Sequence, residues 1–229
     1  MRTLPIIFST EMVQSVQNDT KNQTRRTQGL EKINKDPEEW ILDGLRIDNK
    51  FIFHKKDKGV ECFLTPKFLE GDILWIRETT AVDNFFDTIY KADNSDQERI
   101  TSWRPSIHMP KQLARIFLKV TNVRCERLSE ISDEDARAEG IEIIPDYYWT
   151  EGALNYMYCE DDRSYRREYF FLDGNYGIGT GAFANHNGLV ASFLSLFAKI
   201  NSWEFVEKDP WVWVYEFEKT EKPLNFLKN

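Results

Sequence analysis

The sequence Glu70-Gly71-Asp72-Ile73-Leu74-Trp75-Ile76-Arg77-Glu78 carries the strongest local structural signal in the chain. It begins with a Gly-Asp pair typical of a tight turn, and a run of β-branched and aromatic residues follows. In an extended backbone Ile73 and Trp75 lie on one face, and Leu74 and Ile76 lie on the other. Both faces are therefore apolar over much of their length. This pattern predicts a strand that is covered on both sides, as in a small barrel or a covered sheet.

Apolar runs elsewhere in the chain predict more strands than helices. Strands are expected at residues 4–9, 115–128 and 211–217, and an amphipathic helix is expected at residues 189–200. This order fits an α+β fold, a small twisted β-barrel decorated with a few helices, better than a doubly wound sheet.

Capping residues predict two shorter helices. Ser9 or Thr10 can cap the first helix, and Ser132 can cap the second, which Gly140 ends. Glu139 then falls on the last turn of the second helix, where a negative charge is unfavourable against the helix dipole. Helix stability does not explain a carboxylate at this position, so Glu139 is a candidate functional residue.

Two segments interrupt this pattern, and we expect both to be insertions in a single domain that spans residues 1–229. Residues 28–66 contain only short strand-like or turn-like runs, and residues 142–186 are rich in Tyr, Asp, Arg and Gly. The glycines from Gly174 to Gly181 match neither a phosphate-loop nor a dinucleotide-binding pattern, so a loop is expected there.

The composition predicts a folded protein that does not coat a nucleic-acid backbone. Of the 229 residues, 41 % are hydrophobic and 14 % aromatic, and the net charge is −8. A protein that tracks along DNA or RNA usually presents a broad basic surface. A small basic site for one nucleotide is still compatible with this charge, because the local potential depends on nearby groups.

Neither a metal site, nor a cofactor, nor a membrane segment is expected. Cys62, Cys125 and Cys159 are far apart with no CxxC pair, and the three histidines are scattered. No apolar run approaches the roughly 20 residues that a membrane helix needs. Residues 1–9 lack the cleavage site of a signal peptide. We therefore expect a cytoplasmic protein, in the bacterial host cytoplasm if it is phage-encoded.

Four segments, taken together and in this order, carry a family resemblance. They are Phe8-Ser9-Thr10 with Lys21-x-x-Thr24-Arg25-Arg26, Gly71 to Thr79, Trp103 to Pro110, and Ile131 to Ile141, and the closing segment Asp209 to Glu218 belongs with them. The chain resembles the ASCH-domain family, in the longer form often carried by phages and prophages. The resemblance implies a PUA-like β-barrel. Some smaller members are amidohydrolases that remove the acetyl group from N4-acetylcytidine.

The resemblance implies a catalytic triad of Lys21, Thr24 and Glu139. The family's active site uses a Lys, a Thr three residues later, and a Glu on the helix after the central strands. A threonine hydroxyl is a weak nucleophile that needs a neighbouring base, and Lys21 can serve only when neutral. Burial and a nearby cation such as Arg25 or Arg26 favour that neutral form. Glu139 would then orient Lys21 or pass a proton to the leaving amine. Without the family context, Lys21-x-x-Thr24 is a pattern common on solvated loops.

Seven further residues are candidate substrate contacts. Arg25 and Arg26 can hold a phosphate through paired hydrogen bonds, or they can pair with acidic residues. Trp75 can stack on a base, or it can pack in the core. The full set is Arg25, Arg26, Trp75, Arg77, Glu78, Arg104 and Ser106.

The sequence thus predicts an amidohydrolase that removes an acyl group from a modified nucleobase or nucleoside such as N4-acetylcytidine. Three alternatives stay open: a non-catalytic module that binds RNA or a modified nucleotide, a metal-assisted ribonuclease, and a phage accessory protein that acts through protein contacts. The expected partner is a small nucleoside or RNA.

Overall fold

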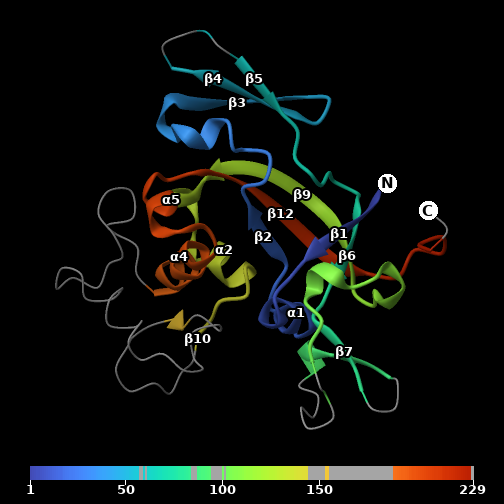
Figure 1. The fold of residues 1–229 in the computed structure, drawn as a ribbon. Coiled ribbons are helices and arrows are strands. Elements are labelled where there is room, and N and C mark those ends of the chain that lie inside the picture. Colours follow the sequence, from blue (N-terminus) through green and yellow to red (C-terminus); the bar gives the residue numbers. More distant parts are fainter. Residues whose placement is uncertain are drawn as a thin grey trace. The chain divides into compact units, whose positions relative to one another are not determined.

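The protein is a mixed α+β chain in which strands predominate (Figure 1). The structure is a computed structural model, and it describes residues 1–56, 59, 61–83, 87–93, 100, 102–143, 153–154 and 188–227. Most of the expected insertion at residues 142–186 lies outside the described residues, as does Cys159.

The regular elements follow one another along the chain as short strands separated by helices and turns. The strands are β1 (Thr3–Ile7), β2 (Gln23–Arg26), β3 (Trp40–Ile47), β4 (Lys50–Lys55), β5 (Glu61–Leu64), β6 (Ile73–Arg77), β7 (Thr80–Val82), β8 (Thr88–Tyr90), β9 (Phe117–Arg127), β10 (Glu142–Ile143), β11 (Ala153–Leu154) and β12 (Trp211–Thr220). The α-helices are α1 (Thr10–Gln17), α2 (Asp133–Ala138), α4 (Gly188–Asn201) and α5 (Trp203–Glu207). Short 3-10 helices are η1 (Ile33–Lys35), η2 (Pro37–Glu39), η3 (Lys91–Asp93), η5 (Ser106–His108), η6 (Lys111–Leu113) and η7 (Leu128–Glu130).

The main sheet has five strands in the order β1-β6-β9-β12-β2. β1 runs parallel to β6, with Leu4 opposite Leu74, and β6 runs antiparallel to β9, with Leu74 opposite Leu118. The smaller sheets are β3-β4-β5, β7-β8 and β10-β11. The mixture of helices and strands confirms the α+β class. No closed barrel is found among the described strands, so the PUA-like barrel stays a prediction.

The chain divides into two compact units. Unit 1 comprises Met1–Asn22, Phe68–Asn122 and Glu216–Asn229, and unit 2 comprises Gln23–Lys67 and Val123–Tyr215. The long strands β9 and β12 contribute residues to both units. The expectation of one domain with two insertions stays a prediction.

In unit 1 the predicted turn and strand at residues 70–78 are present. Gly71 has a φ of +81°, a left-handed conformation that side-chain-bearing residues rarely adopt. Its N–H donates to the Val120 carbonyl at 2.8 Å, and the Val120 N–H donates to the Asp72 carbonyl at 2.9 Å. The first four residues of β6 are all buried, as expected for a strand covered on both faces.

In unit 2 a continuous apolar core lies between α2, α4, α5 and strand residues. α4 contacts both α2 and α5 (Figure 1). The buried members of this core are Leu128, Ile131, Ala136, Ile141, Leu189, Val190, Phe193, Leu194, Leu196, Phe197, Ala198, Val206, Val212 and Val214. The apolar pattern that predicted a helix at residues 189–200 therefore marks the helix face that this core buries.

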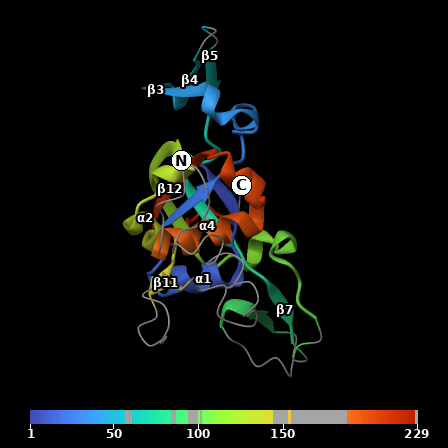
Figure 2. The ribbon, with the colours of Figure 1, turned by 90° about the vertical axis from the view of Figure 1, so that its left-hand side faces the viewer.

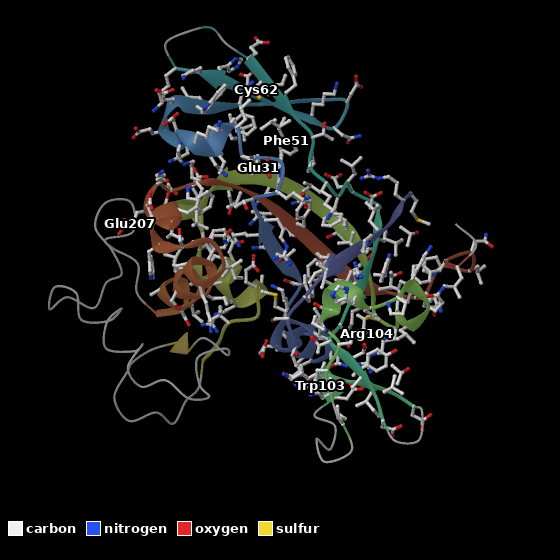
Figure 3. All side chains as sticks on the ribbon, in the orientation of Figure 1. Glu31, Phe51, Cys62, Trp103, Arg104 and Glu207 are labelled. Carbon is white, nitrogen blue, oxygen red and sulfur yellow. The ribbon has the colours of Figure 1, made fainter. Side chains whose placement is uncertain are left out.

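The short strands expected within residues 28–66 form the sheet β3-β4-β5 (Figure 2). Figure 3 labels Phe51 and Cys62 on this sheet. Its β4 packs edge-on against β12: the Phe53 and Trp211 ring centres lie 5.2 Å apart, and those of Phe51 and Trp213 lie 4.9 Å apart. This segment is thus tied into unit 2 by aromatic contacts.

Both predicted helix caps are present. Ser9 Oγ accepts a hydrogen bond from the Met12 N–H at 3.3 Å at the start of α1. At the start of α2, Ser132 Oγ accepts from the Asp135 N–H at 3.1 Å, and the Asp135 carboxylate accepts from the Ser132 N–H at 3.2 Å. This reciprocal pair is a capping box. α2 ends with Glu139 as its C-cap.

Candidate functional site

The three predicted catalytic side chains belong to buried residues. Lys21, Thr24 and Glu139 are only 3, 1 and 7 % exposed. Lys21 lies in unit 1, just before β2, with its Nζ 5.7 Å from the centre of the Phe8 ring. Thr24 in β2 and Glu139 at the end of α2 lie in unit 2. Lysine is seldom buried in folded proteins, so the alternative of a solvated loop at Lys21-x-x-Thr24 is not supported.

The strand β2 presents its side chains alternately to two faces. Gln23 and Arg25 therefore share one face, and Thr24 and Arg26 share the other. Gln23 Nε2 donates to Asp135 Oδ1 on α2 at 3.0 Å. The face that carries Gln23 and Arg25 is therefore the one turned toward the acidic residues of α2.

Arg25 lies at the centre of a group of ion pairs, which we call the Arg25 cluster. Its members are Arg25, Arg124, Glu126, Asp135 and Glu139. Arg25 has a fully buried side chain. Its Nη2 lies 2.6 Å from Glu126 Oε1 and 3.1 Å from Asp135 Oδ2. Its Nη1 lies 3.3 Å from Glu139 Oε1. One guanidinium therefore contacts three carboxylates from β9 and α2.

A second arginine, Arg124, binds two of the same carboxylates. Its Nε lies 2.8 Å from Glu126 Oε2, and its Nη2 lies 2.6 Å from Asp135 Oδ1. Burial alone raises the pKa of Asp135, but the charge of Arg25, the Gln23 hydrogen bond and the charge of Arg124 lower it to below its usual value. Glu126 and Asp135 are therefore each shared between two guanidinium groups.

Arg26 lies on the other face of β2 and also interacts electrostatically with Glu139. Burial lowers the pKa of the Arg26 guanidinium, and electrostatic interactions with Glu139 and Tyr215 partly oppose this shift. An arginine remains charged at physiological pH despite such a shift. Glu139 therefore has a direct ion pair with Arg25 and a further favourable interaction with Arg26.

Three of the predicted substrate contacts lie along β6 and just after it in unit 1. Trp75 packs edge-on against Phe226, with ring centres 6.0 Å apart, and the Arg77 guanidinium carbon lies 5.8 Å from the Trp75 ring centre. Glu78 is buried and accepts hydrogen bonds from Arg115 at 3.0 and 2.7 Å. The packing of Trp75 favours its role in the core over base stacking. Arg115 balances the negative charge of Glu78 through these hydrogen bonds.

The remaining two predicted contacts lie near the surface of unit 1. Arg104 is exposed and lies beside Trp103 (Figure 3), and its backbone pairs with Thr80 through N–H donations of 2.6 and 3.1 Å. Ser106 begins η5 and is half-buried. A side chain at the position of Arg104 is accessible to a charged ligand, and its role in binding stays a prediction.

The sequence did not single out Gln23, Arg124, Glu126 or Asp135 as site residues. In the sequence, Asp135 lies between the predicted helix start at Ser132 and its end at Gly140, and Arg124 and Glu126 lie within the strand expected at residues 115–128. Alternation places Arg124 and Glu126 on one face of β9, which is a local signal. That this face meets β2 and α2 depends on pairing between distant parts of the chain.

Three further findings bear on the predicted absence of metals and membrane contacts. No group of three or more His, Cys, Asp or Glu side chains that could hold a metal ion is found in the described part of the chain. Cys62 and Cys125 are both free and buried. Among the described helices, none is both long and apolar enough to cross a membrane.

No family model, curated protein or solved structure matches this chain. The resemblance to the ASCH-domain family therefore depends on the sequence motifs alone.

Proposed function

We propose that the protein is an ASCH-like amidohydrolase, with a PUA-like barrel, that removes an acyl group from a modified nucleobase or nucleoside such as N4-acetylcytidine. The observation that supports this most is the burial of all three motif residues, Lys21, Thr24 and Glu139, none more than 7 % exposed. An amine, a hydroxyl and a carboxylate are costly to bury. The burial of each of these groups fits side chains that are retained for chemistry rather than for solubility.

In the proposed reaction Thr24 is the nucleophile. Its Oγ1 attacks the carbonyl carbon of the amide while neutral Lys21 accepts the hydroxyl proton. Protonated Lys21 passes that proton to Glu139. Glu139 then donates it to the leaving amine as the carbon–nitrogen bond breaks. Water then hydrolyses the acyl ester on Thr24, which releases the carboxylic acid and restores the hydroxyl. Burial favours the neutral form of an amine, which is the form that Lys21 needs.

Incubation of the purified protein with N4-acetylcytidine tests the proposal. We expect cytidine and acetate as products, measured by chromatography. Thr24→Ala removes the nucleophile, so we expect kcat to fall by at least about 10³-fold. Thr24→Ser is the matched control, because it keeps the hydroxyl and should retain measurable turnover.

Two of the alternative functions predict results that differ from those of the amidohydrolase. Binding of the nucleoside without turnover by the wild-type protein would support a binding module. Cleavage of single-stranded RNA that EDTA abolishes would support a ribonuclease. Full activity of Thr24→Ala would exclude Thr24 as the nucleophile.

A further inference from the structure

We infer that Arg25 is a positioning residue for Glu139, which it holds through an ion pair while Glu126 and Asp135 hold Arg25 in place; this inference rests on the proposed amidohydrolase function. The sequence indicated Arg25 as a substrate contact. The contacts of its guanidinium give it a different role, in which it acts on the reaction only through Glu139.

The surroundings of Arg25 do not suit a phosphate ligand. Both of its Nη atoms face carboxylate oxygens at 2.6 to 3.3 Å, and the side chain is fully buried. The ring centre of Phe193 lies 5.6 Å from its guanidinium carbon. A phosphate bound to this guanidinium would also lie close to three carboxylates. Repulsion at such distances in a buried site is large.

The two shorter contacts of Arg25, to Glu126 and Asp135, orient its guanidinium toward Glu139. Glu126 and Asp135 bind Nη2, and Arg124 binds the other oxygen of each of these carboxylates. Because a guanidinium is planar and rigid, fixing Nη2 also fixes where Nη1 points. Nη1 points at Glu139. The cluster therefore presents one donor in a set position to one carboxylate.

Two features indicate that this arrangement is not optimised for stability alone. Glu139 is the C-cap of α2, where the partial negative charge of the helix end disfavours a carboxylate. The Arg25 Nε–H is buried without a hydrogen-bond acceptor among the described residues. A buried donor without an acceptor lowers the stability of the folded state. Such costs are expected where a site constrains the geometry.

The role predicts a change in turnover without a change in substrate affinity. Arg25 holds the proton carrier Glu139 and does not touch the substrate, so its loss should leave KM nearly unchanged. Misplacement of a catalytic group by a small distance lowers rates by up to about 100-fold. We therefore expect Arg25→Gln to lower kcat by about 10- to 100-fold. Arg25→Lys keeps the charge but not the planar fork, so it should recover part of this loss.

The test is a double-mutant cycle with N4-acetylcytidine as the substrate. The variants are Arg25→Gln, Glu139→Gln and the double variant, with kcat and KM measured for each. Since Arg25 acts through Glu139, adding Arg25→Gln to Glu139→Gln should lower kcat by less than about threefold. Urea unfolding shows whether each variant is folded. If Arg25→Gln does not fold, Arg25→Lys replaces it in the cycle.

Arg127→Gln is the matched control for the loss of an arginine ion pair in unit 2. Arg127 Nε lies 3.2 Å from Asp209 Oδ2, outside the Arg25 cluster. Its substitution should lower stability and leave kcat unchanged. A raised KM with unchanged kcat in Arg25→Gln, or kcat losses that multiply in the double variant, would overturn the positioning role alone. A wild-type protein without turnover would overturn the proposed function and this role with it.

Discussion

The side chain of Asp72 anchors the turn that begins β6. Its carboxylate accepts hydrogen bonds from the Leu69 N–H at 2.8 Å and the Arg2 N–H at 3.1 Å, and the Arg2 guanidinium also donates to it. Burial by itself raises the pKa of Asp72, but the hydrogen bonds and the charge of Arg2 lower it to below its usual value. The Gly71-Asp72 pair that predicted a turn from sequence thus also fixes the N-terminal residues.

This lowered pKa predicts a pH-dependent contribution to stability. A carboxylate whose pKa is lower in the folded state stabilises the protein above its unfolded pKa of about 3.9, and that contribution is lost as the pH falls through the folded value. We expect Asp72→Asn to lower the free energy of unfolding by about 1–2 kcal/mol at neutral pH. The difference from wild type should shrink below about pH 4. Urea unfolding across pH measures it.

Glu221→Gln is the control for Asp72→Asn, because Glu221 is an exposed carboxylate in the same unit. Its substitution should leave stability almost unchanged at every pH. A stability difference for Asp72→Asn that stayed constant from neutral to acidic pH would show that the lost charge is not the cause.

Among the elements, α2 shows which parts of the fold follow from local chemistry. Its start at Ser132 and its end before Gly140 were predictable, because caps act within a few residues. Its contact with β2 was not predictable, because Arg25 and Asp135 lie far apart in the chain and no periodicity encodes their pairing. The strand order β1-β6-β9-β12-β2 was not predictable for the same reason. Each strand has a local signal, whereas its neighbour in the sheet depends on tertiary packing.

The capping box of α2 predicts a measurable stability loss. Ser132→Ala removes the oxygen that accepts the Asp135 N–H, so we expect the free energy of unfolding to fall by about 1 kcal/mol. Ser132→Gly should cost only a few tenths of a kcal/mol, because glycine is itself tolerated at this position. Chemical unfolding measures both variants. Ser102→Ala, at an exposed position, is the control, and equal stability of Ser132→Ala and wild type would refute a stabilising cap.

For the molecule as a whole, the candidate site was predictable only where a motif supplied it. Lys21, Thr24 and Glu139 came from motif spacing within the family resemblance. The cluster around Arg25 draws its residues from β2, β9 and α2, and only the folded chain brings these elements together. From sequence, pairing with acidic residues was one of two alternatives for Arg25. Strand alternation was the local signal for Glu126, the residue at the shortest ion-pair distance from Arg25, and it did not identify Arg25 as the partner.

The overall charge predicts which form of substrate the protein accepts. With 38 acidic against 30 basic residues, the chain carries a net charge of −8, which repels a polyanion such as RNA. A free nucleoside is neutral, so we expect its kcat/KM to change less than about twofold between about 50 and about 200 mM NaCl. An RNA oligomer that contains the same acetylated cytidine should be the poorer substrate at the lower salt concentration. If the oligomer is preferred and its kcat/KM falls about tenfold or more with added salt, the protein binds the phosphate backbone through a local basic surface, and the net charge does not decide the substrate.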